Sequence, residues 1–232
     1  VVVLKKLGFN PIIVHGGGKR INSKLLEVNI KSNFINGLRV TDKDTINIVE
    51  DVLIEFNKEI VEALNELDCK AKRITTKENN IITVVQENKD LGFVGKPTRI
   101  NKEFLTEIIK ANKVPVIAPL GLDKDNQTFN INADTTAGSI AIELKARRLI
   151  IISDVEGVLD SEKKLIPEIN SIKANELIDQ EVISGGMIPK IKNCLDVASN
   201  GVKAVVIIDG RKNHSLLFEL LSDKGSGTLI RE

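Results

Sequence analysis

"IIVHGGGKRIN", residues 12–22, places three consecutive glycines between an apolar run and a stretch with helical spacing. Glycine lacks a Cβ, so the main chain can turn sharply there and its N–H groups can approach another group closely. The stretch predicts a buried strand, a glycine turn and a helix over 19–29. Because free N–H groups and the positive end of the dipole meet at a helix start, Gly16, Gly17 and Gly18 are candidates for an anion site. A tight turn with a close helix crossing would use the same glycines.

Outward from this turn, short apolar stretches alternate with amphipathic ones along most of the chain. Buried strands are expected directly after Pro11 and over 114–121, 148–160 and 202–209. Helices are expected over 42–67, 101–113, 133–146, 172–179 and 188–199 and from His214. This alternation predicts an α/β fold, a three-layer αβα sandwich with a mainly parallel central sheet and helices on both faces.

Turn signals predict a few antiparallel pieces within this pattern. The dipeptide Asn36-Gly37 lies between two short apolar stretches and predicts a hairpin, and a second hairpin is expected through Asp125-Asn126. Residues 72–100 alternate polar and apolar side chains and predict a small antiparallel ribbon.

The long helix over 42–67 has a capping residue at its start, Thr41 or Asp42. Apolar residues recur along it every three or four positions, at Ile46, Val49, Leu53, Phe56, Ile60, Leu64 and Leu67. From the pattern alone, such a stripe favours a helix lying on a sheet over a dimer seam.

Composition narrows the class of function. The 33 Lys and Arg nearly balance the 32 Asp and Glu, and Trp and Tyr are absent, so neither a strong field nor the best stacking side chains would attract nucleic acid. Cys69 and Cys194 are far apart and are expected to be reduced thiols in a cytoplasmic protein, and two His argue against a metal site. No apolar run approaches the ~18 residues of a membrane span, so we expect a soluble chain.

A second glycine turn, "SGGMIPK" at 184–190, precedes the helix over 188–199. Lys190 lies in the first helical turn, where a cation opposes the helix dipole by a few tenths of a kcal/mol. A bound anion would explain that placement, and a solvated surface lysine is the alternative.

Polar side chains also follow two of the predicted strands. Ser153 and Asp154 end the most apolar strand, with Gly157 in the next turn, and ligands of open α/β sheets bind at this carboxyl edge; Asp154 also suits a plain turn. The stretch "FNINAD", 129–134, carries Asn130, Asn132 and Asp134, of which helix capping by Asp134 explains only one. Arg39, in a hairpin arm, is either a solvated strand residue or a fork for a carboxylate.

Taken together, these stretches resemble successive motifs of the amino acid kinase family, and within it the branch that phosphorylates N-acetyl-L-glutamate. The motifs, in order, are "IIVHGGGK", "NGLRVTD", "LGFVG", "VPVIAPLG", "FNINADTTAGSIA", "IIISDVEGVLD" and "SGGMIPKI". The combination of "NGLRVT" with "NINAD" is the most discriminating. The resemblance covers nearly the whole chain.

This resemblance implies transfer of the γ-phosphoryl group of ATP, with Mg²⁺, to the side-chain carboxylate of N-acetyl-L-glutamate in arginine biosynthesis. Such a carboxylate, with a pKa near ~4.3, is already ionised at neutral pH. No general base is therefore needed, and positive charge and oriented N–H groups must bring the two anions together.

The resemblance also implies roles for individual residues. Gly16, Gly17 and Gly18 would hold the phosphoryl group and substrate, with Gly17 counted as catalytic, while Arg39 and Asn130 would bind the α-carboxylate end of the amino acid. Lys190 would neutralise charge on the ATP phosphates, and Asp134 would orient lysines. The nucleotide site would be lined by Ser153, Asp154, Gly157, Val182, Ile183 and Ser184.

The family pattern implies two lobes, an amino-acid lobe over 1–146 and a nucleotide lobe over 147–232. It begins with a strand that carries a second catalytic lysine and a glycine pair, which we expect upstream of Val1. The last motif, "GRKNHSLLFELLSDKGSGTLI", resembles the arginine-inhibited, hexameric enzymes, which implies an arginine site near His214, Glu219, Gly225 and Gly227. An ordinary helix, turn and strand would explain these residues equally.

Several alternatives stay open at this point. A sister kinase acting on aminoadipate or glutamate, or a catalytically dead arginine- or nucleotide-binding regulator, would share many of these motifs. The resemblance assigns the long helix 42–67 to a dimer contact, so a homo-oligomer is expected, either dimer or hexamer. Binding of a PII-type protein, and a plastid instead of a cytoplasmic location, are further possibilities within the family.

Overall fold

In the computed structural model, which describes residues 1–232, the chain divides into two units, Val1–Thr136 and Ala137–Glu232. Helix α5 (Ala133–Glu143) begins in the first unit and continues into the second. The functional boundary expected at residue 146 lies just beyond this helix.

The first unit contains five helical segments and nine strands. They are α1 (Val2–Lys6), β1 (Ile13–Val14), α2 (Gly18–Glu27), β2 (Phe34–Ile35), β3 (Leu38–Arg39), α3 (Lys43–Glu66), β4 (Ala71–Ile74), β5 (Ile82–Gln86), the 3-10 helix η1 (Lys89–Leu91), β6 (Gly95–Ile100), α4 (Lys102–Lys110), β7 (Val114–Ile117), β8 (Leu120–Leu122) and β9 (Thr128–Asn130).

The core of the first unit is a parallel sheet with strand order β1-β7-β4. Its middle strand, β7, is buried along its whole length, which explains why 114–117 reads as a continuous apolar run. Strand β4 belongs to this sheet, so the prediction of one antiparallel ribbon over 72–100 is wrong at its start. The antiparallel part is β5 with β6, because only these two strands share a ladder there.

The expected strand 114–121 is also two strands. The chain leaves the parallel sheet after Ile117, and β8 pairs with β5 and β9 in a second sheet of order β6-β5-β8-β9. Pro119 lies at the break, where a residue without an N–H cannot continue a ladder. Both predicted hairpins are confirmed: β2 pairs antiparallel with β3, and β8 with β9.

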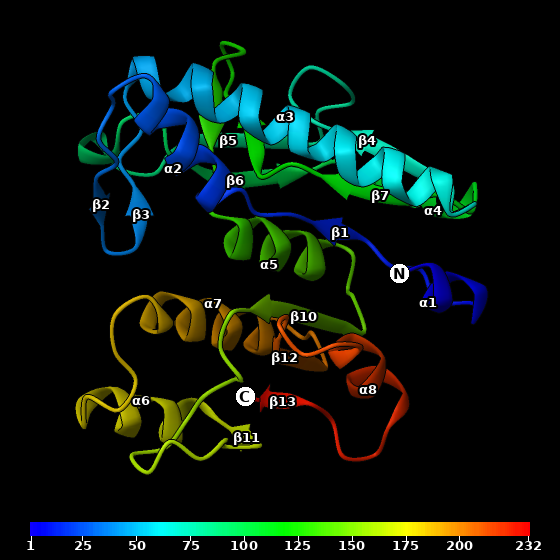
Figure 1. The fold of residues 1–232 in the computed structure, drawn as a ribbon, viewed down its shortest axis with the longest axis vertical. Coiled ribbons are helices and arrows are strands. Elements are labelled where there is room, and N and C mark those ends of the chain that lie inside the picture. Colours follow the sequence, from blue (N-terminus) through cyan, green and yellow to red (C-terminus); the bar gives the residue numbers. More distant parts are fainter. The chain divides into compact units, whose positions relative to one another are not determined.

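Helix α3 lies along the parallel sheet and contacts β4 and β7, as its apolar stripe predicted (Figure 1). Of the two possible caps, Asp42 is the one used: its side chain accepts a hydrogen bond of 2.8 Å from the N–H of Thr45. Leu67 falls beyond the helix end and is 62% exposed, so its place in the stripe was wrong. The buried face includes a polar residue, Asn57.

The second unit holds a four-stranded sheet covered by helices. Besides α5, its elements are β10 (Arg148–Ser153), β11 (Glu168–Ile169), α6 (Ser171–Asp179), α7 (Met187–Ser199), β12 (Ala204–Asp209), α8 (Ser215–Leu221) and β13 (Gly227–Ile230). The strand order is β10-β12-β13-β11, and β13 runs antiparallel to β12 while the other pairs are parallel. Strand β10 ends at Ser153, earlier than the expected 148–160, because the chain turns there. The predicted α/β class is confirmed in both units.

Candidate functional site

A pocket of about 190 Å³ in the first unit brings together the glycine turn and the two residues expected to bind the amino acid. Its walls come from β1–α2, β3, α3 and the ends of β8 and β9. It is lined by Gly16, Gly17, Gly18, Ile21, Phe34, Gly37, Leu38, Arg39, Leu53, Val94, Pro119, Asn130, Ile131, Asn132 and Ala133. Residues from positions 16 to 133 therefore converge on one cavity.

The glycine turn connects the end of β1 to the start of α2, with Gly17 as the N-cap residue. The N–H groups of Gly16 and Gly17 have no acceptor in the protein, because neither takes part in a strand ladder or a turn bond. Together with the positive end of the α2 dipole, they offer donors to an anion in the pocket.

The three glycines are needed for different reasons. A Cβ on Gly17 would lie 2.6 Å from Cδ2 of the buried Leu53, so Gly17 allows α3 to pack closely against the turn. A Cβ on Gly16 or Gly18 would meet nothing within 4 Å, and neither residue has a positive φ. The close-crossing interpretation therefore applies to Gly17 alone. Packing gives no reason for the other two glycines, which line the pocket.

This difference gives a testable pair of substitutions. Gly17→Ala should lower the free energy of unfolding by about 1–3 kcal/mol, because the added methyl group overpacks against Leu53. Gly16→Ala should leave stability within about 0.5 kcal/mol but lower the affinity for the pocket's ligand, because its methyl group points into open space. Urea unfolding and ligand titration of both variants measure the two effects. Equal stability of both variants would contradict the packing argument.

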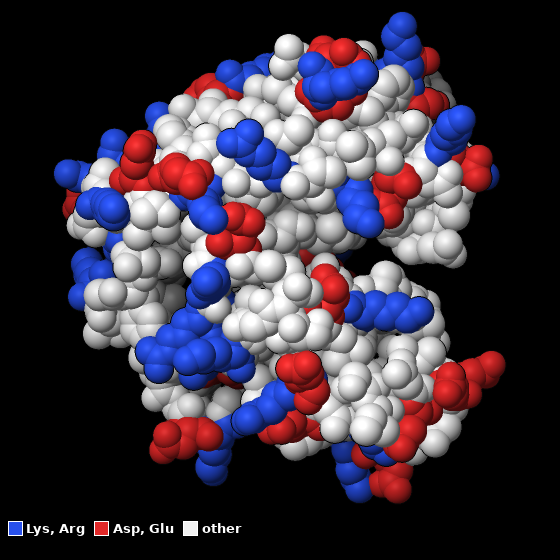
Figure 2. Space-filling view, turned by 180° about the vertical axis from the view of Figure 1, so that it is seen from behind, with Lys and Arg blue, Asp and Glu red and all other residues white.

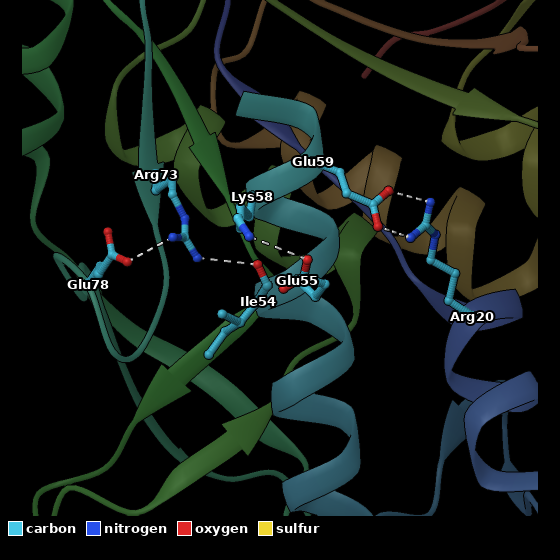
Figure 3. A network of polar contacts seen from close by, with 7 residues as sticks. All are labelled: Arg20, Ile54, Glu55, Lys58, Glu59, Arg73 and Glu78. Atoms are coloured by element: carbon cyan, nitrogen blue, oxygen red, sulfur yellow. Dashed lines mark hydrogen bonds and ion pairs between the residues drawn. The ribbon is translucent and has the colours of Figure 1, made fainter. Parts of the chain in front are cut away.

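The first turn of α2 carries two basic residues, Lys19 and Arg20, which would oppose the helix dipole. The charge of Arg20 is neutralised by a residue of α3: its guanidinium donates to both carboxylate oxygens of Glu59, at 2.6 and 2.7 Å (Figure 3). It also lies 4.1 Å from the centre of the Phe56 ring. The pairing raises the pKa of Arg20 and lowers that of Glu59. Lys19 is therefore the basic residue of this turn that has no comparable two-point pair with a carboxylate.

Arg39 is a buried cation on the wall of the pocket. It is 7% exposed, which excludes the solvated-strand interpretation. Its guanidinium donates to Ser32 Oγ and Asn22 Oδ1, both at 2.7 Å, and stacks 4.7 Å from the Phe34 ring centre. All these partners are neutral and no carboxylate pairs with it, so burial lowers the pKa of Arg39. A guanidinium held in this way is preorganised for an anionic ligand.

Asn130, at the end of β9, completes this wall. Its Nδ2 lies 3.3 Å from Oγ1 of the fully buried Thr41, whose hydroxyl donates to the carbonyl of Arg39. Asn132, two residues on, caps α5 by accepting from the N–H groups of Asp134 and Thr135. The sequence-based assignment of the cap to Asp134 was therefore wrong; Asp134 lies in the first turn of α5, where its charge complements the dipole.

Sequence reasoning missed several residues of this site. Asn22, Ser32 and Phe34 surround Arg39 but come from separate segments, so no local spacing connects them. His15 and Asn57 lie beneath the glycine turn, and His15 Nε2 is 3.2 Å from Asn57 Nδ2. The signal available for Asn57 was a polar residue within the apolar stripe of α3.

The burial of His15 predicts a pH dependence of stability. Desolvation, with a smaller effect from Arg20, lowers the pKa of His15 below its ordinary 6.5, against the hydrogen bond to Gly16. Below about pH 6.5 the unfolded chain therefore takes up a proton that the folded chain resists. As the pH is lowered through this range, the free energy of unfolding should decrease by at most about 1.4 kcal/mol per pH unit. His15→Asn should lose less stability between about pH 7.5 and 5.5 in urea titrations; an equal loss would contradict this assignment.

The predicted nucleotide residues of the second unit occupy different environments. Ser153 and Asp154 lie at the carboxyl end of β10, as expected. Gly157 has a φ of +145°, and a Cβ there would lie 2.6 Å from Thr228 Oγ1, so packing already requires a glycine. Ile183 is buried in the hydrophobic core, beside Val182, while Ser184 is exposed.

A charged pair missed by the sequence analysis lies at the end of β12, in register with Ser153. Arg211 donates to both carboxylate oxygens of Asp209, at 2.9 Å each. These bonds, with the N–H of Arg211, lower the pKa of Asp209 to about 2. The carboxylate is ionised at any physiological pH.

Near the C-terminus, the structure brings Glu219 and Gly225 together. Glu219 is 9% exposed, accepts from the N–H of Ser226 at 2.8 Å and lies 3.7 Å from Arg148. Gly225 has a φ of +65°, and a Cβ there would lie 3.1 Å from Glu219 Oε2. Gly227 is explained by packing, because its backbone crosses Ile207 closely. His214 precedes α8 with a φ of +63°.

Three further observations concern the cysteines, the possible metal ligands and the apolar character of the helices. Cys69 and Cys194 are both buried and neither forms a disulfide, and no group of three His, Cys, Asp or Glu side chains could hold a metal ion. None of the helices has the length and apolar character that crossing a membrane requires. On the face in Figure 2, basic and acidic side chains are interspersed.

Comparisons with known proteins point to one family. The sequence model described as "Amino acid kinase family" matches residues 1–209. A protein named acetylglutamate kinase from Pelagibacter ubique (strain HTCC1062) is 98% identical over 232 residues, which are 100% of this chain and 81% of that protein. Another protein named acetylglutamate kinase, from Ruegeria pomeroyi (strain ATCC 700808 / DSM 15171 / DSS-3), is 46% identical over the same shares of the two chains.

Among solved structures, smu.665 from Streptococcus mutans UA159 is 34% identical with a TM-score of 0.87. The match covers 98% of this chain and 88% of that one. The structure of N-acetylglutamate synthase from Neisseria gonorrhoeae, in complex with coenzyme A and N-acetyl-glutamate, has a TM-score of 0.89 at 22% identity and is similar in fold. It covers 99% of this chain and 54% of that one.

Proposed function

The chain belongs to the amino acid kinase family, and on that premise we propose that it transfers the γ-phosphoryl group of ATP to the side-chain carboxylate of N-acetyl-L-glutamate. The product is N-acetyl-L-glutamyl 5-phosphate, an intermediate of arginine biosynthesis. The observation that carries the proposal is the buried Arg39, without an anionic partner, in the same pocket as the glycine turn. Its cation and the turn's N–H donors suit a ligand that carries a negative charge at each end.

In this proposal one end of the pocket binds the α-carboxylate and the other binds the transferring phosphoryl group. Arg39 and Asn130 bind the α-carboxylate, which orients the side-chain carboxylate toward the glycine turn. The N–H groups of Gly16 and Gly17 then donate to the phosphoryl group as it leaves ATP. The attacking carboxylate is already ionised, so no side chain need remove a proton, and catalysis rests on placement and charge.

Residues outside this pocket supply the remaining charges in the proposal. Lys190, early in α7, neutralises negative charge that builds up on the ATP phosphates, and Asp134 orients the lysines. Ser153, Asp154, Gly157 and the stretch 182–184 line the nucleotide. The residues present do not form a metal cage of their own, so Mg²⁺ is best regarded as entering with the phosphates of ATP, and no side chain is assigned to it.

The arginine site stays a prediction of its own. Glu219 supports it, because a nearly buried carboxylate beside the backbone turn at Gly225 can accept from the guanidinium of free arginine. Arg148 already lies 3.7 Å from that carboxylate and would compete for it. The dimer or hexamer, the PII-type partner and a cytoplasmic location also stay predictions. The absence of a disulfide at the two cysteines supports the last of these.

The direct test measures ATP consumption by the full-length protein with N-acetyl-L-glutamate, with and without L-arginine. Turnover supports the kinase, and its suppression by arginine supports the regulatory site. If the protein turned over glutamate or aminoadipate but not N-acetyl-L-glutamate, the proposed substrate would be wrong and that amino acid would take its place. Absence of turnover with all three, together with retained nucleotide or arginine binding, would favour a regulator over an enzyme.

A further inference from the structure

Beneath the glycine turn, two polar side chains are buried without an evident structural need. His15 follows β1 and is 6% exposed, and Asn57 lies in the middle of α3 and is fully buried. Nδ1 of His15 lies 2.8 Å from the carbonyl oxygen of Gly16. Its other nitrogen, Nε2, lies 3.2 Å from Nδ2 of Asn57.

The hydrogen positions in the contacts from Val116 through Asn57 and His15 to Gly16 can be assigned by starting at the Val116 carbonyl. The carbonyl of Val116, in β7, can only accept, so Asn57 must present its amide nitrogen to it, at 2.9 Å. The same nitrogen faces His15 Nε2, which must then accept. The single ring hydrogen of a neutral imidazole is left on Nδ1, where it donates to Gly16. Burial lowers the pKa of His15, which keeps the ring neutral at neutral pH.

This bond fixes the direction of one peptide group. The chain contains no cis peptide bond, so the N–H of Gly17 points away from the carbonyl of Gly16. That N–H has no acceptor in the protein, and Gly17 lines the pocket. A peptide between two glycines can flip at low steric cost because neither flanking residue has a Cβ. Once flipped, it would turn a carbonyl oxygen toward the anion instead of a donor.

We propose that His15 and Asn57 are positioning residues: through the fixed Nδ1–H tautomer they hold the Gly16–Gly17 peptide so that its N–H faces the transferring phosphoryl group. The proposal deepens the kinase function and rests on it for the identity of the anion. Asn57 Oδ1 is buried without a hydrogen-bond partner. An unsatisfied amide oxygen in the apolar face of a helix is a cost that packing alone does not explain.

The tautomer is tested directly and without any substrate. We expect ¹⁵N spectra of histidine-labelled protein at neutral pH to show His15 with a protonated Nδ1 and a bare, strongly downfield-shifted Nε2. The chain has two histidines, so loss of one ring's signals in His15→Phe assigns them. A ring protonated at Nε2, or at both nitrogens, would overturn the proposal whether or not the protein proves to be a kinase.

Kinetics of matched variants test the positioning role. His15→Phe keeps an aromatic ring but removes both polar contacts, and should lower kcat by about 10- to 100-fold while the KM for N-acetyl-L-glutamate changes less than about threefold. His15→Asn places an amide N–H near the position of Nδ1–H and should restore most of kcat. If the two variants lose kcat equally, or if kcat follows only the folded fraction measured by circular dichroism, the role is structural and the proposal fails.

The role of Asn57 is tested with one variant of this residue and a control variant elsewhere on α3. Asn57→Leu keeps the bulk of the side chain but removes the donor to Nε2, so only the Gly16 carbonyl still favours the Nδ1–H tautomer. The Nε2–H form should gain population, which moves the shifts of both nitrogens toward intermediate values, and kcat should fall. Asn47→Leu, at an exposed position of α3, is the control and should change neither. An unchanged His15 tautomer in folded Asn57→Leu would remove Asn57 from the proposal.

Discussion

Lys190→Ala is expected to lower kcat by about 10²- to 10³-fold, a loss of ~3–4 kcal/mol of transition-state stabilisation. The physical reason is charge. Both reactants are anions, and their repulsion is greatest as the phosphoryl group lies between them, so a cation stabilises that state more than it stabilises bound ATP. The KM values for ATP and N-acetyl-L-glutamate should therefore change less than about fivefold. Steady-state kinetics in both substrates measure the split.

Lys192→Ala is the matched control for this experiment. It lies on the same helix, two residues later, and is exposed, so it changes the net charge equally while kcat should stay within about twofold. A rise in KM for Lys190→Ala with unchanged kcat would contradict charge neutralisation in the transition state. It would make Lys190 a ground-state contact of ATP.

Arg39→Met should separate binding from stability. Methionine keeps most of the side-chain length without the charge, so the KM for N-acetyl-L-glutamate should rise by about 100-fold or more, in keeping with the ~2–5 kcal/mol lost when one partner of a buried charge pair is removed. In the free protein, however, Arg39 is a buried cation without a carboxylate. Removing it relieves a desolvation cost, so the free energy of unfolding should stay equal or rise.

Arg99→Met provides the comparison, because Arg99 is an exposed residue of β6 in the same unit. Its KM and its unfolding free energy should both stay near those of the unmodified protein. If Arg39→Met were destabilised by several kcal/mol while substrate affinity stayed the same, Arg39 would be a structural residue. The assignment of the α-carboxylate to it would then be wrong.

Prediction from the sequence succeeded where the signal is local. Hairpins at Asn36-Gly37 and Asp125-Asn126 form because these residues adopt positive φ at little cost, at 50° and 81° for the first pair and 61° for Asn126. The start of α3 at Asp42 and its burial against a sheet follow from one capping residue and a 3.6-residue period. Local patterns made the glycine turn, Arg39 and Asn130 candidates, the family resemblance gave them roles, and one pocket gathers all three.

Prediction from the sequence failed where a local stretch was compatible with two structures. Residues 114–121 read as one apolar strand, yet the chain changes sheets at Pro119, and apolarity does not specify which sheet a strand joins. Both Asn132 and Asp134 are good caps, and only the path of the chain selects Asn132. Arg39 could be either a solvated strand residue or a fork for a carboxylate, because a hairpin arm does not reveal what covers it.

The sequence by itself determined most of the elements, their order and the family, because turn residues, caps and apolar periods act within a few positions of the chain. Only the tertiary structure decided that Arg39 is buried among neutral partners and that Asn57 reaches His15 across 42 positions of sequence. The reason is physical: desolvation and the direction of a hydrogen bond depend on what surrounds a group in space. Neighbours in space come from segments that no local pattern connects.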